Sequence, residues 1–465
     1  QQQVFQYTFI YLSIYIYTHT HTHTIIIIIV TKKKMSLLIT SAKHLLKAQK
    51  NSLKHGLKQP QLRSTFGTKA GDWGSWKDEL SLETKSVHEG VTPDPRTGAV
   101  LTPIFQSTTF VQESVENYLG KGFSYSRQAN PTVKDLETRI AAMENGVGAT
   151  CVSTGMAATT TVISGTMNAG DHCIITESSY GGTNRLCREQ FVPLGMEFDF
   201  IDMRDLDNIK NAIKPNTKLI FSESPSNPTL RLCDVQAISD IAKENGITHV
   251  CDATFATPMM MRPLDHGADL VIQSTTKFYD GHNMTVGGAV IAGSEELHER
   301  MQFVSNMHGN IMSPQNAFLT LQTSKTLPLR FRQQSATAQK LAEWLEAHPK
   351  VEKVVYPGLD SFPQKDLADK YHRDGIHGAM LWFDVAGGDT AAITLMNTIQ
   401  RPWSLCENLG ATESIITACA VMTHANMLVE DRLRVGVSDG FIRISCGIEN
   451  ADDLIRALSE SLDQI

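Results

Sequence analysis

The feature that most constrains the fold is an alternation of short, β-rich apolar runs with longer amphipathic stretches, beginning near residue 123 and continuing to residue 292. Each apolar run suits one buried strand, and each stretch between runs can form a helix that crosses back over the sheet. This order predicts a mostly parallel sheet with helices on both faces. The seven predicted strands are 148–152, 172–176, 198–201, 218–221, 248–251, 270–272 and 289–292.

The pattern changes after Leu327-Pro328, where one long helical stretch is followed by short β segments. This change predicts a large domain over residues 129–327 and a smaller α/β domain over residues 328–465. An amphipathic helix with an ordinary structural role is expected over residues 131–145. The elements predicted after the change are a helix at about 330–348, strands at 380–385 and 440–445, and a closing helix from Ala451.

Composition indicates an enzyme with small-molecule substrates. The 465 residues carry a net charge of −7, and no basic patch of domain scale favours nucleic acid or an anionic membrane as a partner. The eight cysteines are scattered through apolar stretches without a CxxC pair. We therefore expect reduced, mostly buried thiols, and neither a disulfide framework nor a metal site.

The first 34 residues have an unusual composition, because a Thr-His repeat at 18–24 runs into five isoleucines at 25–29. We interpret residues 1–34 as translated non-coding sequence or a disordered leader ahead of Met35. A membrane anchor and a His-rich metal-binding tract are the alternatives. The apolar run is interrupted before it reaches the roughly 20 residues that a membrane span needs, which disfavours the anchor.

Residues 35–71 contain no aspartate or glutamate, whereas lysines are spread among leucine, alanine and serine. This composition is typical of an organelle transit peptide and predicts a mitochondrial location. A disordered basic leader on a cytoplasmic protein is the alternative, because the segment is rich in lysine rather than arginine. The first acidic residue is Asp72, so the folded body is expected to begin shortly after it.

Lys277 stands in the run 273–282, Gln-Ser-Thr-Thr-Lys-Phe-Tyr-Asp-Gly-His, which follows a predicted strand. Hydroxyl groups just before it, among them those of Ser274 and Thr276, could hold a phosphate beside its amine. A lysine whose pKa is lowered by burial or nearby positive charge attacks aldehydes readily, so the run suits a Schiff base with pyridoxal phosphate. A solvated lysine at the end of a strand is the ordinary alternative.

Other candidates also follow strands, because open α/β sheets bind ligands at the carboxyl ends of their strands. Gly155 and Met156 open a predicted helix whose amides would point at an anion, although an ordinary tight turn fits as well. Asp252, with Thr254 two residues later, follows the strand 248–251. Its carboxylate could keep a pyridine nitrogen protonated, or it could cap a helix or lie in a loop.

Tyr180 and Arg443 are two further candidates for a binding site. Tyr180 precedes two glycines after the strand 172–176, so its ring could stack on a flat heterocycle or fill core space. Arg443 alternates with apolar residues in the predicted strand 440–445. Its guanidinium could clamp a substrate carboxylate with two hydrogen bonds or form a structural salt bridge.

Taken in this order, these segments resemble the cystathionine γ-synthase, cystathionine γ-lyase and methionine γ-lyase family of pyridoxal phosphate enzymes, over about Ser86 to Leu462. The resemblance implies an α/β fold of the aspartate-aminotransferase-like type, fold type I, with a large cofactor-binding domain and a smaller carboxy-terminal domain. It also implies pyridoxal 5'-phosphate as cofactor, an amino-acid substrate and a homo-oligomer built as a dimer of dimers.

By this resemblance Lys277 would carry the cofactor, Asp252 would pair with the pyridine nitrogen, and Tyr180 would stack on the ring and act as acid or base. An arm over residues 72–128 would contribute to the neighbouring subunit's site. The residues implied in holding the rest of the cofactor are Gly155, Met156, Thr254, Ser274 and Thr276, with Tyr125 and Arg127 on that arm. The residues implied in binding substrate are Asn227, Glu407, Asn408 and Arg443.

Three positions bear on the reaction within the family. Gly182 stands where methionine γ-lyases usually carry a reactive cysteine, and Glu407 matches an acid that can meet the distal ammonium of cystathionine. Asn408 departs from the family pattern, in which serine is usual. We expect cystathionine γ-lyase activity, with cystathionine γ-synthase, methionine γ-lyase and a catalytically silent binding protein as alternatives. A nucleotide-binding protein is disfavoured, because the sequence has no Gly-rich dinucleotide fingerprint or Walker loop.

Overall fold

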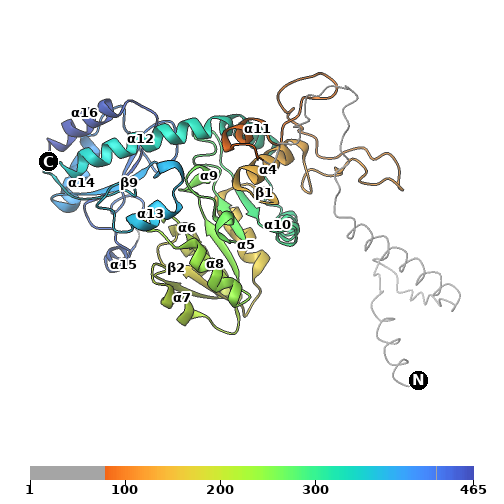
Figure 1. The fold of residues 1–465 in the computed structure, drawn as a ribbon, viewed down its shortest axis with the longest axis horizontal. Helices are drawn as coiled ribbons and strands as arrows, with labels where there is room; N and C mark the ends of the chain where they lie inside the picture. Colours follow the sequence, from red (N-terminus) through yellow and green to blue (C-terminus); the bar gives the residue numbers. More distant parts are fainter. Residues whose placement is uncertain (1–78, 426) are drawn as a thin grey trace, which may run out of the picture. The chain divides into compact units, whose positions relative to one another are not determined.

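The computed structural model describes residues 79–425 and 427–465, which belong to one compact unit (Figure 1). The predicted leader over residues 1–34 and the transit-like segment over residues 35–71 lie outside the described residues. Within the described ranges, no helix combines the length and the apolar character that a membrane crossing requires.

A seven-stranded sheet forms the larger layer of the fold, in the order β1-β7-β6-β5-β4-β2-β3. β7 runs antiparallel to β1 and β6, and the other neighbours pair in parallel. All strands except β7 therefore point the same way, and their carboxyl ends lie at one edge. The strands are β1 (Gly148–Val152), β2 (His172–Thr176), β3 (Glu197–Ile201), β4 (Thr217–Glu223), β5 (Thr248–Asp252), β6 (Leu270–Gln273) and β7 (Gly288–Ala292). The prediction of a mostly parallel sheet is confirmed, with predicted strand ends within two residues of those observed.

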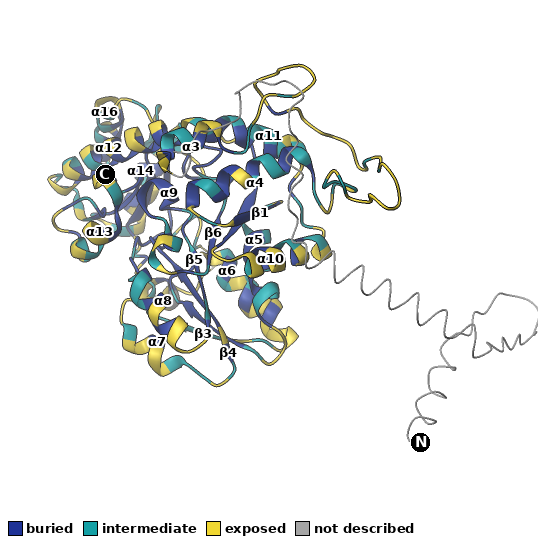
Figure 2. Cartoon of the chain, turned by 45° about the vertical axis from the view of Figure 1, so that its right-hand side comes forward, coloured by how far each residue is buried: buried dark blue, intermediate teal, exposed yellow. Residues whose placement is uncertain are grey.

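Alternate residues of the buried strands face opposite sides of this sheet, as the pleat of a strand requires. In β7, Ala289 packs in one hydrophobic cluster with α4 (Pro131–Glu144), whereas Val290 packs in another with α5 (Gly155–Thr166). Figure 2 shows buried strands between helices whose outward surfaces are exposed. The prediction of helices on both faces is therefore confirmed.

Helix α4 shows how the local sequence sets the ends of an element. The Asn130 side chain caps its amino terminus by accepting from the next two free backbone amides, and Pro131 occupies the first turn. The helix ends at Asn145, whose φ of 61° suits asparagine better than most residues. The helix predicted over residues 131–145 is confirmed to within one residue.

A second, five-stranded sheet has the order β10-β11-β12-β9-β8 and shares a hydrophobic core with α12 (Leu327–Glu346), α14 (Gly388–Thr398) and α16 (Ala451–Leu462). These helices surround β9 in Figure 1. The predicted long helix begins earlier than expected, at Leu327, because Pro328 is tolerated in a first turn. The domain boundary at residue 328 stays a prediction. The strands of this sheet are β8 (Val351–Val355), β9 (Met380–Val385), β10 (Ser404–Leu405), β11 (Ile415–Ala418) and β12 (Phe441–Ser445).

The other elements connect and cover the two sheets. The eight cysteines are free and all but Cys406 are buried, as predicted. The remaining α-helices of the described ranges are α3 (Leu82–His88), α6 (Gly181–Arg185), α7 (Leu206–Ala212), α8 (Val235–Glu244), α9 (Thr257–Met260), α10 (Glu295–His308), α11 (Pro314–Thr323), α13 (Lys365–Tyr371) and α15 (Val429–Arg434).

Candidate functional site

Five chain segments meet at the carboxyl edge of the seven-stranded sheet, where they follow β1, β2, β4, β5 and β6. Hydrogen bonds join neighbouring segments. The Ser274 amide donates to Thr254 Oγ1 at 3.0 Å, and the Tyr180 amide donates to Glu223 Oε2 at 2.7 Å. The predicted site residues on these segments are Gly155, Met156, Tyr180, Asn227, Asp252, Thr254, Ser274, Thr276 and Lys277.

Lys277 lies in the loop after β6, and its Nζ donates to Asn408 Oδ1 at 2.6 Å. Burial, and then the nearby guanidinium of Arg443, lowers the pKa of Lys277 to about 8. More of this amine is unprotonated near neutral pH than in an exposed lysine, and the unprotonated amine is the form that attacks an aldehyde. The environment of Lys277 suits the predicted covalent role.

Two carboxylates lie beside each other near the ends of adjacent strands. Asp252 of β5 and Glu223 of β4 are paired in the parallel register. Burial raises the pKa of both, and for Glu223 the neighbouring Asp252 raises it further. Asp252 accepts from the Thr254 amide at 3.0 Å. A cationic group between these acids would relieve their repulsion, and a protonated pyridine nitrogen is such a group.

The amino terminus of α5 packs against the lysine loop. A Cβ built on Gly155 would lie 2.8 Å from Ser274 Oγ, so a larger residue could enter only if the loop or the helix shifted. Thr154 caps the helix by accepting from the Ala157 amide at 2.9 Å. The other first-turn amides of this 12-residue helix stay available for an anion, which suits a phosphate beside Ser274.

The Tyr180 ring lies over a glycine that leaves room for it. A Cβ on Gly182 would lie 2.5 Å from Tyr180 Cε1 and 3.0 Å from Met156 Sδ. The Tyr180 residue is 47% exposed, so its ring is open to a ligand. With the lowered-pKa amine, the paired acids and the helix amino terminus, this aromatic surface completes a set of groups that fits pyridoxal phosphate.

Arg443 of β12 comes from the second sheet to the same site. Its Nη1 donates to Asn227 Oδ1 at 3.0 Å, and its Nη2 donates to the Asn408 backbone oxygen at 3.5 Å. Arg443 therefore joins the segment after β4 to the loop between β10 and β11, whose Asn408 accepts from Lys277. These bonds are structural, yet a guanidinium carries five N–H donors, and others can serve a substrate carboxylate.

Some predicted site residues have other partners in this chain. Thr276 Oγ1 donates to the Gly287 backbone oxygen at 3.2 Å and accepts from the Gly287 amide at 3.0 Å. Arg127 Nη1 donates to the Oδ1 and backbone oxygen of Asn306, in α10, at 2.6 and 2.8 Å. Glu407 is exposed. The proposed contacts of these residues with cofactor or substrate stay predictions.

The arm that carries Tyr125 and Arg127 exposes several large apolar side chains. Val111 is 91% exposed and Val115 is 89% exposed. A surface of this kind suits contact with another protein chain. The exposed large hydrophobic residues in the described part of the arm are Val87, Val100, Leu101, Ile104, Phe105, Val111, Val115, Tyr118, Leu119 and Tyr125.

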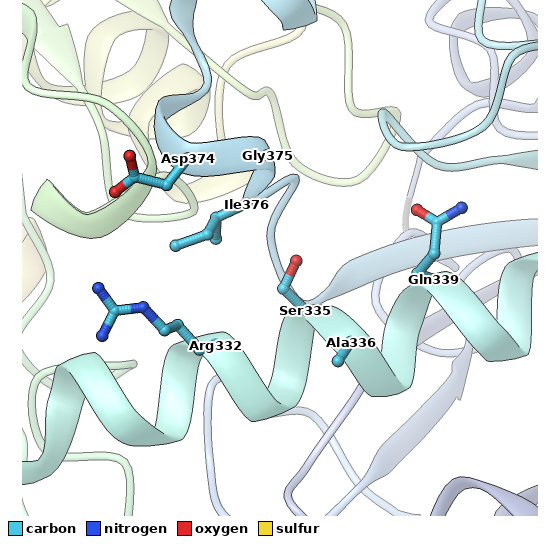
Figure 3. A pocket seen from close by; sticks show the side chains of 7 residues that line it. All are labelled: Arg332, Ser335, Ala336, Gln339, Asp374, Gly375 and Ile376. Carbon is cyan, nitrogen blue, oxygen red and sulfur yellow. The ribbon is translucent and has the colours of Figure 1, made fainter.

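A separate cavity of about 330 Å³ lies between α12 and the loop before β9 (Figure 3). Arg332, Ser335 and Gln339 line it from the helix, and Asp374 lies on the opposite side. Arg332 is also bonded to Glu83. The cavity contains none of the predicted site residues.

Glu223 is a site residue that sequence reasoning missed. Its Oε1 accepts from the Asn227 amide at 2.8 Å, while Oε2 accepts from Tyr180, so one carboxylate fixes the backbone of two predicted site residues. The available signal was an acid at the end of an apolar strand, the same signal that singled out Asp252.

Comparisons with known proteins agree with this geometry. The sequence profile of the Cys/Met metabolism PLP-dependent enzymes matches residues 83–463. Cystathionine gamma-lyase of Bacillus subtilis is 40% identical over 386 residues, which cover 83% of this chain and 100% of that protein. Cystathionine beta-lyase MetC of the same species is 40% identical over 389 residues, covering 84% and 98%. The solved structure of cystathionine gamma synthase from Xanthomonas oryzae pv. oryzae, in complex with aminoacrylate and cysteine, superposes with a TM-score of 0.80, 37% identity and coverage of 83% and 98%.

Proposed function

Because the chain belongs to the Cys/Met metabolism PLP-dependent enzyme family, we propose that it cleaves cystathionine at the γ-carbon to give cysteine, 2-oxobutanoate and ammonia. The observation that carries this proposal is the partly buried Lys277 amine beside Arg443, at the same sheet edge as an exposed tyrosine ring and a pair of acids. Bound pyridoxal phosphate supplies an electron sink that acidifies the hydrogens on the α- and β-carbons of the amino acid.

The residues of this chain would hold the cofactor by distinct contacts. Lys277 would bind its aldehyde carbon, Asp252 would accept from the pyridine nitrogen, and Tyr180 would cover the ring. The amino terminus of α5, at Gly155, would bind the phosphate together with Ser274. Glu223 orients the Tyr180 and Asn227 backbones around these groups.

Proton transfer is assigned to Lys277 and Tyr180. With substrate bound, the Lys277 amine would take a proton from one carbon and return it to another, because its pKa of about 8 lies near neutral pH. The Tyr180 hydroxyl serves the leaving sulfur as acid. Arg443 binds the substrate carboxylate, and Glu407 meets the distal ammonium of cystathionine.

Gly182 supports a cystathionine enzyme over a methionine γ-lyase. A side chain at this position would meet the Tyr180 ring at 2.5 Å, so the reactive cysteine usual in methionine γ-lyases does not fit this arrangement. Cystathionine γ-synthase is the second candidate, because the solved synthase has the same fold at 37% identity. Cystathionine β-lyase activity is a further candidate, because the relative MetC is 40% identical to this chain.

A substrate panel on the purified full chain separates these activities. The proposal predicts 2-oxobutanoate from cystathionine, whereas β-cleavage would give pyruvate and the synthase would make cystathionine from an O-acylhomoserine and cysteine. Methanethiol from methionine alone would exclude all three. Lys277→Ala should abolish both product and the visible absorbance of bound cofactor, while circular dichroism stays unchanged.

We also propose a homo-oligomer in which the arm completes the neighbouring subunit's phosphate site. The exposed apolar arm supports this assembly. Lys277→Ala and Arg127→Ala would each be inactive alone. Mixing the two variants should restore activity, because a hybrid then contains one site with both residues intact. No recovery after confirmed subunit exchange would contradict a shared site.

A mitochondrial location is proposed from the acid-free, lysine-containing composition of residues 35–71. The mass of the native amino terminus, measured on protein isolated from fractionated cells, tests it. Cleavage before Asp72 together with recovery in mitochondria is expected, whereas an intact basic segment on cytoplasmic protein would contradict the proposal.

A further inference from the structure

A line of four polar side chains, which we call the relay, runs from Lys277 to the protein surface. Lys277 Nζ donates to Asn408 Oδ1 at 2.6 Å, Asn408 Nδ2 donates to Asn283 Oδ1 at 2.6 Å, and Asn283 Nδ2 donates to Glu413 Oε2 at 3.1 Å. Two loops supply these residues, the one after β6 and the one between β10 and β11. Asn408 is among the residues predicted to bind substrate, whereas Asn283 is not among the predicted site residues.

Glu413, at the outer end of this line, sets the orientation of both asparagine amides. An ionised carboxylate only accepts hydrogen bonds, so Glu413 requires Asn283 to present its amide nitrogen. The Asn283 oxygen then faces Asn408 and accepts from its nitrogen, which leaves the Asn408 oxygen facing the lysine. Thr412 Oγ1 also donates to Glu413 Oε2, at 3.1 Å. Each amide in the line therefore has one favoured orientation.

Backbone contacts fix the two loops against each other. Gly410 has a φ of 80°, and a Cβ there would lie 2.8 Å from the Phe278 amide nitrogen, so only glycine allows this approach. The Thr412 amide donates to the Gly281 oxygen at 2.8 Å. Asn283 has a φ of 56°, a conformation that asparagine adopts more readily than most residues. The side chains are therefore held in register by the backbone on both sides.

We propose that Glu413 and Asn283 orient the Asn408 amide so that its oxygen holds the Lys277 amine, which makes Asn408 a positioning residue. This inference rests on the proposed function, in which that amine binds the cofactor and carries protons. The serine usual at this position has a hydroxyl that both donates and accepts, so it would not impose a direction. An amide that offers only its oxygen keeps the amine as donor, and its lone pair stays free for the aldehyde.

Reconstitution with the cofactor tests the relay. Pyridoxal phosphate is added to cofactor-free full-length protein, and the rate at which visible absorbance returns is measured across pH. Asn408→Leu should lower the alkaline plateau rate about tenfold. It should also move the midpoint of the rate–pH profile to lower pH, because the ammonium form of Lys277 loses a hydrogen-bond acceptor. Asn408→Asp keeps an acceptor of the same size, so its plateau should stay near wild type with the midpoint at higher pH. Arg443, the charged side chain that lowers the pKa of Lys277, is unchanged throughout.

Glu413→Gln tests the outer end, because glutamine can present either its oxygen or its nitrogen to Asn283. The plateau should fall about threefold, on the scale of one weakened hydrogen bond. Glu352→Gln, at an exposed glutamate of β8, is the matched control and should behave as wild type. A wild-type profile for Asn408→Leu, or equal profiles for Glu413→Gln and Glu352→Gln, would overturn the relay.

Reduction of the reconstituted protein with borohydride, followed by peptide mapping, separates the two proposals. Cofactor fixed to another lysine would overturn the proposed function and the relay with it. Cofactor fixed to Lys277, together with unchanged pH profiles, would overturn the relay alone.

Discussion

Glu223 and Asp252 occupy paired positions on the parallel strands β4 and β5, which places two carboxyl groups of raised pKa at the same sheet edge. Asp252 was expected there from the sequence, and Glu223 was not. Glu223 adds a second buried acid beside the predicted pyridine site, which can give up its proton when a cationic ring binds there, and it also accepts from the amides of Tyr180 and Asn227. Both effects should strengthen the binding of a cationic ring.

Glu223→Gln should therefore weaken cofactor binding about tenfold, or by about 1.4 kcal/mol. Glutamine keeps the volume, but only its carbonyl oxygen can accept, so one of the two backbone amides loses its partner. The dissociation constant of pyridoxal phosphate, measured by fluorescence titration, reports the change. Glu460→Gln, at an exposed glutamate of α16, is the matched control. Equal affinities for the two variants would show that Glu223 does not act on the cofactor.

Glu144 should make folding stability depend on pH. This glutamate is buried beneath the lysine loop, where Gln273 Nε2 and the Tyr279 hydroxyl donate to its Oε1, and burial raises its pKa to about 8. The folded protein then keeps a proton that the unfolded chain releases above a pH of about 4.5. The stability contributed by this group is complete below that pH and is lost as the pH rises toward 8.

In Glu144→Gln this titration is removed, so the unfolding free energy should fall less steeply with pH than in the wild type, by up to about 1.4 kcal/mol per pH unit. Denaturant unfolding of the holoenzyme at several pH values between those limits measures the two slopes. Glutamine can accept the same two hydrogen bonds through its oxygen, which makes it a close mimic of the protonated acid. Identical slopes would contradict a protonated Glu144.

The sequence predicted the regular elements well, because strand and helix patterns are local. Seven predicted strands coincide with β1 to β7, and the helix at 131–145 carries its own cap. The carboxyl-end rule also brought Lys277 and Asp252 to one edge, because it follows from parallel pairing alone.

Contacts between distant loops carry no such local signal. Lys277 and Asn408 are 131 residues apart, and their hydrogen bond depends on how the lysine loop packs against Gly410. Thr276 is predicted to bind phosphate through its hydroxyl, whereas that hydroxyl also bonds the amide and the backbone oxygen of Gly287, 11 residues along the chain. Side-chain chemistry identifies candidates, and only the packing decides which partner each one meets.

Gly182→Ala tests the space beneath Tyr180. The added methyl would lie 2.5 Å from Tyr180 Cε1, and the partly exposed ring should tilt away because it is free to move outward. We expect kcat to fall about tenfold, with an altered cofactor spectrum and an unchanged fold. Gly181→Ala is the matched control, because a methyl there has no atom within 4 Å. Similar kcat values for the two variants would show that the ring position does not matter.

Gly155→Ala should separate the helix amino terminus from the lysine loop. The new Cβ would lie 2.8 Å from Ser274 Oγ and 2.9 Å from Ser274 Cβ, so either α5 or the loop must move. The first-turn amides would then no longer converge with Ser274 on one anion, and we expect the dissociation constant of pyridoxal phosphate to rise at least about tenfold. Equilibrium dialysis of cofactor against the full-length variant measures this change.

Ser274→Gly supplies the second arm of a double-mutant cycle. On its own it should weaken cofactor binding, because a predicted phosphate donor is lost. In the Gly155→Ala background it should instead strengthen binding, because it removes both atoms that the new methyl meets. Residues in direct contact give such non-additive effects, whereas independent residues give additive ones. If the double variant binds the cofactor more weakly than Gly155→Ala alone, the contact with Ser274 is not what requires glycine at position 155.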